Sequence, residues 1–139
     1  MELFQVDDDS LLFISPAITD WGPLSCHAID TVIDLDGDID SGVPTCPNQS
    51  LYIYFPIFDD DLPNLEKLQA LGNLGASLVA SRHCVLSHCG MGYNRSALVA
   101  GVILHKLGMS GTDVVRRIQE RRPGALYNEC FAAYLESLR

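Results

Sequence analysis

Hydrophobic and polar positions along the first half of the chain follow patterns that predict short strands. Apolar runs at 3–6 and 11–14 flank an acidic turn that contains serine, and this arrangement predicts a hairpin. The β-branched run at 31–35 leads into the turn sequence Asp36-Gly37-Asp38, which predicts a buried strand. We expect another strand at 51–55, which Pro56 ends.

From residue 64 onwards the apolar positions take a helical spacing, which predicts an amphipathic helix over 64–81. After a short strand at 84–87, the segment 97–104 is apolar on every face, so we expect a buried helix that Gly108 ends. Ser110 begins a capping-box sequence for the next helix, which Pro123 ends, and a final helix is expected near 131–138. This order predicts an α/β fold, with a small, mostly parallel central sheet flanked by helices in a single domain over 1–139.

Composition excludes several classes of protein. Of the 139 residues, 47% are hydrophobic and 19% charged, so the chain can bury a core and should not be disordered. The formal net charge of −9 argues against nucleic acid or an anionic membrane as partner, because both repel an acidic surface. No basic segment precedes an apolar run at the amino end, and no apolar stretch is long enough for a bilayer. We therefore expect a cytoplasmic protein.

Cysteine and histidine usage gives no sign of a cross-linked or metal-binding scaffold. The five cysteines are an odd number and include no CxxC pair, which argues against a disulfide framework and a zinc knuckle. The four histidines show no paired ligand spacing such as HExxH. The expectation is a protein without a metal or another cofactor.

One loop carries a specific chemical pattern, because a predicted strand runs directly into His88-Cys89-Gly90-Met91-Gly92-Tyr93-Asn94-Arg95-Ser96 and then into the buried helix. A cysteine six residues before an arginine is common by chance. A glycine three residues after the cysteine and a serine seven after it make the match far more specific. Open α/β sheets bind their ligands where a strand ends, which is where this loop lies.

The spacing suits a phosphate. The five residues between Cys89 and Arg95 can curl until successive backbone N–H groups converge on one anion at a helix N-terminus. Arg95 can grip two phosphate oxygens, and the same N–H groups favour a thiolate at Cys89. Ser96 can donate a hydrogen bond to the sulfur. The pattern predicts phosphoryl transfer through a cysteinyl-phosphate, with these phosphate-binding residues: Gly90, Met91, Gly92, Tyr93, Asn94 and Arg95.

The run from His88 to Ser96 resembles the HCxxGxxRS signature of the protein tyrosine phosphatase superfamily, and its Gly-Tyr-x-Arg-Ser ending is similar to the small dual-specificity phosphatases. The resemblance covers about residues 29–138 and includes the Arg-Arg-Pro-Gly-Ala-Leu-Tyr-Asn run at 121–128. It implies a hydrolase acting on phosphotyrosine, and on phosphoserine or phosphothreonine, in a phosphorylated protein or a small phosphomonoester. His88 is then expected to hold the loop by hydrogen-bonding backbone and to tune the thiolate. Ser87 stands where the family usually has an apolar residue.

The resemblance also implies a general acid, an aspartate about thirty residues upstream that follows a strand and a proline. A Pro-Ile-Phe-Asp sequence ends at Asp59, which lies 30 residues before Cys89. Asp60 and Asp61 follow directly, so the assignment to Asp59 keeps these two alternatives, and Asp61 is also a candidate helix cap. Asn128 is a candidate brace for the loop and equally a candidate cap of the last helix.

Two other classes of protein share such an anion cradle. A rhodanese-like or arsenate-reducing enzyme has the cradle without the upstream Pro-x-x-Asp sequence, so Asp59 argues against this class. A non-catalytic phosphate-binding or scaffolding module needs no nucleophile. The joint presence of the cysteine, arginine, serine and aspartate therefore favours an enzyme. Cys84, five residues before Cys89, is either a redox partner for it or a core residue of the strand, and the strand position favours the core.

Overall fold

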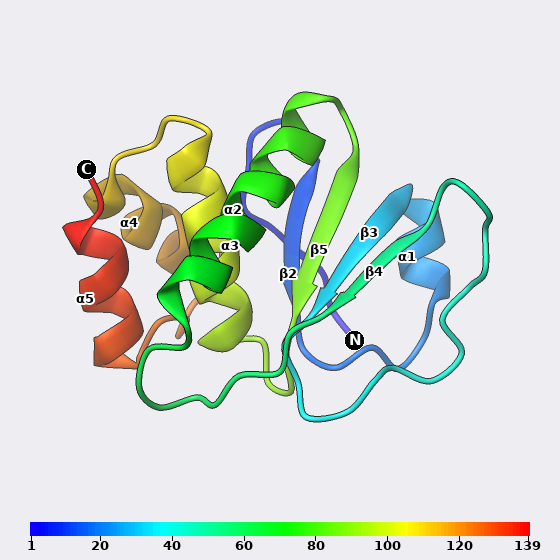
Figure 1. Ribbon diagram of the computed structural model, residues 1–139, viewed down its shortest axis with the longest axis horizontal. Helices are drawn as coiled ribbons and strands as arrows, with labels where there is room; N and C mark the ends of the chain where they lie inside the picture. Colours follow the sequence, from blue (N-terminus) through cyan, green and yellow to red (C-terminus); the bar gives the residue numbers. More distant parts are fainter.

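The computed structural model describes all residues, 1–139, and places one five-stranded sheet at the centre of the chain (Figure 1). Strand order across the sheet is β1-β2-β5-β3-β4, and only the β1–β2 pair is antiparallel. The predicted hairpin and mostly parallel sheet are thus confirmed. The strands are β1 (Phe4–Gln5), β2 (Leu12–Ser15), β3 (Ile29–Asp34), β4 (Leu51–Tyr54) and β5 (Cys84–His88).

Helices cover the two faces of the sheet unequally. Figure 1 shows α2 to α5 on one side of the sheet and the short α1 on the other. The four are α2 (Leu65–Ala80), α3 (Arg95–Lys106), α4 (Gly111–Arg121) and α5 (Glu129–Ser137). On the other side, α1 (Gly22–Cys26) was not predicted, because five residues are too few to show a helical period. No helix of the chain combines the length and apolar character needed to cross a bilayer.

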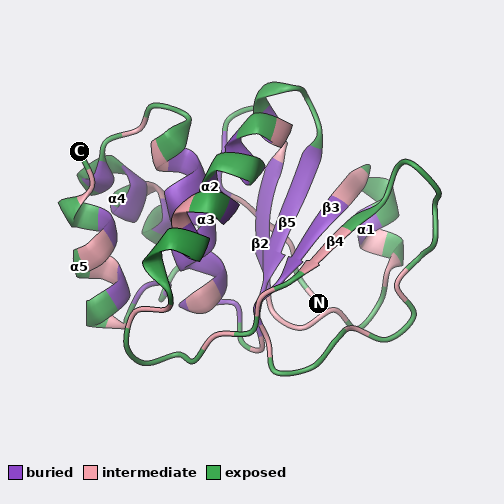
Figure 2. Cartoon of the chain, viewed as in Figure 1, coloured by how far each residue is buried: buried purple, intermediate pink, exposed green.

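The core lies on both sides of the sheet, in a large cluster under α2 and α3 and a small one beside α1. Figure 2 shows the inner strands and α3 as the most buried elements, and every residue from 96 to 104 in α3 is buried. A Cβ atom at Gly72 would lie 2.3 Å from Val102, and one at Gly75 would lie 2.4 Å from Ile103. The two glycines inside α2 therefore allow its close approach to α3.

Three helices begin at a side-chain cap. Asn64 accepts a hydrogen bond from the backbone of residue 67, Ser110 from that of residue 113, and Asn128 from that of residue 131. Each such cap is worth about 1 kcal/mol of stability. The cap of α2 is Asn64, so the alternative role of Asp61 as a helix cap is wrong.

The parallel strands β2, β3, β4 and β5 end at the same edge of the sheet. Beside the segment that follows β2, four loops meet there: residues 35–50 after β3, residues 55–64 after β4, the signature loop (residues 88–96) and residues 122–128 between α4 and α5. This edge holds every residue that the sequence assigned to phosphate chemistry.

Candidate active site

The backbone of the signature loop is turned so that its carbonyl groups point away from its centre. Every carbonyl from residue 90 to residue 93 accepts a hydrogen bond from outside the loop, at 2.9–3.4 Å, from the backbone of Ala17, the side chain of Arg122 and the backbone of Leu126. The backbone N–H groups of residues 90, 91, 93 and 94 have no partner within the protein. This arrangement leaves a ring of unpaired donors at the start of α3, which is the geometry of an anion nest.

Gly92 is required by the packing of the loop on β2. Its φ angle is +75°, and a Cβ atom there would lie 2.7 Å from the backbone nitrogen of Pro16 and 2.9 Å from the carbonyl carbon of Ser15. Both contacts are with backbone atoms, which cannot move aside as a flexible side chain can. Only glycine therefore fits both the angle and the space.

The thiol of Cys89 lies at the bottom of the nest, 2% exposed. The backbone N–H of Gly92 donates to its Sγ at 3.3 Å, and the Oγ of Ser96 lies 3.4 Å from the same atom. The hydroxyl of Ser87 donates to the carbonyl of Ser96 at 3.0 Å, so the polar residue before the His-Cys pair fastens β5 to α3. These donors and the N-terminus of α3 surround the sulfur with partial positive charge.

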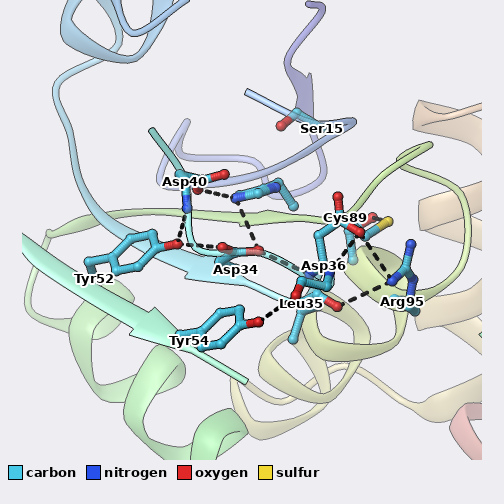
Figure 3. Close-up of polar contacts among 12 residues, drawn as sticks. Ser15, Asp34, Leu35, Asp36, Asp40, Tyr52, Tyr54, Cys89 and Arg95 are labelled. Carbon is cyan, nitrogen blue, oxygen red and sulfur yellow. Dashed lines mark hydrogen bonds and ion pairs between the residues drawn. The ribbon is translucent and has the colours of Figure 1, made fainter. Parts of the chain in front are cut away.

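Arg95 is anchored on one side and free on the other. Its Nη1 donates to the carbonyls of Leu35 at 3.3 Å and Ile57 at 3.4 Å, and it lies 3.5 Å from the carboxylate of Asp36 (Figure 3). Its Nε and Nη2 atoms have no partner within the protein. Such a pair of donors on one edge of a guanidinium can bind two oxygens of one phosphate.

Of the three adjacent acids, Asp59 is the one whose carboxylate contacts the signature loop. Asn94 donates to one of its oxygens at 2.9 Å, and Asn128 donates to the other at 2.8 Å. The side chains of Asp60 and Asp61 form no hydrogen bond or ion pair. Asn128 also bonds the carbonyl of Asp60 at 3.1 Å, so it fills both roles that the sequence left open, as brace and as helix cap.

His88 differs from expectation. Strand register places it opposite Asp34 of β3, and its Nε2 lies 2.6 Å from Asp40 and 3.6 Å from Asp34. Tyr52 completes the group by donating to Asp34 and accepting the backbone N–H of Asp40 at 2.8 Å. The Nδ1 atom of His88 has no partner. The prediction that the His88 ring bonds backbone is wrong, because its Nε2 contacts carboxylates.

Burial dominates the electrostatics of this group. It raises the pKa of Asp40, although the neighbouring His88 acts in the opposite direction. Burial and the hydrogen bond to Asp34 also raise the pKa of Tyr52. Ligand atoms of Asp34, Asp40 and His88 lie within 4.8 Å of one another, an arrangement that could hold a metal ion. The direct bond from His88 to Asp40 accounts for this proximity without one.

Arg122 contacts the signature loop, and the motif did not assign it. Its guanidinium bonds two carbonyls of the signature loop, and its central carbon lies 4.0 Å from the ring centre of Tyr93 and 4.4 Å from that of Phe4. Both contacts have cation–π geometry. The Arg-Arg-Pro run at 121–123 indicated the segment but not which arginine faces the loop.

Cys84 lies on the opposite face of β5 from Cys89. Its side chain joins the small cluster beside α1, whereas Cys89 belongs to the large one. Burial, followed by the nearby charges of Asp30 and Asp7, raises its pKa from 9.0 to about 11. The interpretation of Cys84 as a core residue is supported over the redox alternative.

Comparison with known proteins finds likeness in structure. No family model matches the chain, and no curated protein sequence matches it. Human DUSP28 aligns over 96% of this chain and 90% of its own, with 22% identity and a TM-score of 0.79. A human protein described as tyrosine phosphatase-like serine/threonine/tyrosine-interacting protein covers 96% and 93%, with 23% identity and a TM-score of 0.76. The phosphatase domain of Yvh1 from Chaetomium thermophilum covers 97% and 94%, with 22% identity and a TM-score of 0.75.

These structures share the fold over almost the whole chain at low sequence identity. The sequence resemblance rested mainly on the signature loop, and the structural likeness extends it to the sheet and its helices. The chain has the fold of the small dual-specificity phosphatases of the protein tyrosine phosphatase superfamily.

Proposed function

We propose that the chain is a cysteine-dependent phosphatase that hydrolyses phosphomonoesters through a cysteinyl-phosphate intermediate. The observation that carries the proposal is the nest around Cys89, where unpaired backbone donors and the free edge of Arg95 surround a buried thiol. A module that only binds phosphate has no use for a nucleophile at this point. We expect phosphotyrosine, and phosphoserine or phosphothreonine, in proteins as substrates.

In the first step the Cys89 thiolate attacks phosphorus in line with the leaving oxygen. The sulfur–phosphorus bond forms while the phosphorus–oxygen bond breaks, and Asp59 gives a proton to the departing oxygen. Arg95 and the loop N–H groups bind the equatorial oxygens, where negative charge is held in the transition state. The contacts from Asn94 and Asn128 support this role for Asp59, because they hold its carboxylate beside the signature loop.

In the second step water replaces the sulfur. Asp59, now ionised, accepts a proton from the attacking water, and the sulfur–phosphorus bond breaks to return the thiolate and inorganic phosphate. The hydroxyl of Ser96, 3.4 Å from the sulfur, then donates to the thiolate as it leaves. A hydrogen bond to a charged group of this kind contributes about 1.5–3 kcal/mol.

The proposed reaction uses no divalent cation, because Arg95 and the loop N–H groups supply the positive field that a metal would otherwise supply. The segment 90–94 carries no lysine or arginine, which argues against phosphoinositide and RNA-triphosphate substrates, whose phosphatases tend to have basic residues there.

The test is hydrolysis of p-nitrophenyl phosphate with and without vanadate and EDTA. The proposal predicts turnover that vanadate inhibits and EDTA leaves unchanged, and its loss in Cys89→Ser. A protein that binds phosphate with normal affinity but shows no turnover above that of Cys89→Ser would be a binding module. Activity that EDTA abolishes and a divalent cation restores would place the protein in a metal-dependent class.

A further inference from the structure

The edge of the sheet around the phosphate nest is acidic. On the segments 35–42, 56–63, 89–95 and 122–128 the only basic residues are Arg95 and Arg122, against six aspartates. The guanidinium of Arg122 is occupied by loop carbonyls and aromatic rings. A site built to bind an anion therefore lies inside a rim that repels further anionic groups. The aspartates are Asp36, Asp38, Asp40, Asp59, Asp60 and Asp61.

Asp36 is the acidic residue that lies next to both Arg95 and the signature loop. Its carboxylate lies 3.5 Å from Nη1 of Arg95, and its two oxygens lie 3.6 Å from the position of a Cβ atom on Gly90 (Figure 3). The backbone N–H of Gly37 donates to the same carboxylate at 2.9 Å, which fixes its direction. Its side chain is 37% exposed, so a substrate can reach it.

This position has an electrostatic consequence. A phosphate dianion held by the free edge of Arg95 lies close enough to Asp36 for strong repulsion, because the pair is only partly exposed to solvent. A cationic group on the substrate, beside its phosphate, removes that repulsion by pairing with Asp36. An anionic group there adds to it.

Exposed apolar side chains indicate that the ligand is a polypeptide segment. The four most exposed large hydrophobic residues are distributed one to each of the four loops at this edge. Exposed apolar side chains on each of the four loops suit an extended chain better than a small metabolite. They are Ile39, Phe58, Met91 and Tyr127.

We propose that Asp36 determines specificity by selecting phosphorylated polypeptide segments in which a lysine or arginine flanks the phosphorylated residue. The inference rests on the phosphatase reaction proposed above and names its substrate class. Asp36 acts on binding of the substrate, and it takes no part in proton transfer.

The test compares two phosphotyrosine peptides that differ only in the flanking residues, lysine in one and glutamate in the other. The wild-type protein should favour the lysine peptide by about tenfold or more in kcat/KM at low salt. Asp36→Asn, which keeps the shape and the bond to Gly37, should reduce that ratio to about threefold or less. Glu120→Gln, which removes one charge from the exposed face of α4, should leave the ratio unchanged, and Asp38→Asn should change it less than Asp36→Asn.

Binding of inorganic phosphate, measured by calorimetry, tests Asp36 without any turnover. Asp36→Asn should bind phosphate about fivefold more tightly than the wild type at pH 7. If neither peptide is hydrolysed but phosphate binding tightens as expected, the phosphatase reaction fails and the charge effect of Asp36 stands. An unchanged phosphate affinity, an unchanged peptide ratio, or an equal loss of kcat for both peptides by more than about tenfold overturns the proposal.

Discussion

Replacing Asn128 should separate its two roles, because its oxygen and its nitrogen serve different partners. The oxygen caps α5 by accepting the N–H of Phe131 at 3.2 Å, and the nitrogen donates to Asp59 and to the carbonyl of Asp60. Asn128→Ser keeps an oxygen that can cap the helix and loses the amide N–H groups that bond Asp59 and the carbonyl of Asp60. Asn128→Ala loses both.

The expected magnitudes derive from these bonds. Loss of the cap in Asn128→Ala should lower the free energy of unfolding by about 1 kcal/mol, whereas Asn128→Ser should stay within about 0.5 kcal/mol of the wild type. Loss of the bond to Asp59, at 2.8 Å, releases the carboxyl group from its place beside the signature loop. Because a misplaced acid transfers its proton poorly, both variants should lose about tenfold in kcat when the leaving group needs a proton.

The assay pairs urea unfolding with turnover of phosphotyrosine and of an aryl phosphate whose leaving group departs without a proton. Both variants should lose activity on phosphotyrosine and lose much less on the activated ester. Equal unfolding free energies for the serine and alanine variants would refute the capping role. Wild-type kcat on phosphotyrosine in Asn128→Ser would refute the role of Asn128 in holding the acid.

Three further perturbations probe other parts of the structure. Gly92→Ala should lower kcat by about a hundredfold and reduce the melting temperature, because its Cβ meets backbone of Pro16 and the loop must shift; a variant with wild-type kinetics would contradict this. Ser96→Ala should slow breakdown of the intermediate about tenfold or more and produce a burst of released alcohol in stopped-flow traces. The raised pKa of Cys84 means that the unfolded chain loses this proton first, so the free energy of unfolding should fall between pH 9 and pH 11 by at most about 3 kcal/mol. Cys84→Ala should not show that loss.

Much of the fold could be predicted from patterns that are local in sequence. Each predicted strand and helix is present within a few residues, because the periods of apolar positions reflect which face of each element is buried. The apolar segment 97–104 is the clearest case, since a helix that is apolar all round must be buried all round. The short helix α1 was not predicted, because it buries only Leu24 and so shows no apolar period.

Prediction of the site residues depended in the same way on how close they are in the sequence. Cys89, Ser96 and Arg95 are close in sequence, so their spacing alone predicted one loop around one anion. Asp34 and Asp40 meet His88 only through strand register and the fold of the loop after β3, which no local spacing encodes. Asp36 and Arg122 were likewise not assigned, because long-range packing decides which of several neighbouring charges faces the loop.

The most direct test of the account is to trap the intermediate. Wild-type protein mixed with a phosphotyrosine peptide and quenched in acid within milliseconds should carry a phosphoryl group on the Cys89 peptide, as found by mass spectrometry. Ser96→Ala should carry more of it, because breakdown is slowed, and Cys89→Ser should carry none on its remaining cysteines. A phosphoryl group on another residue, or substrate turnover without any label at Cys89, would contradict the assignment of Cys89 as the nucleophile.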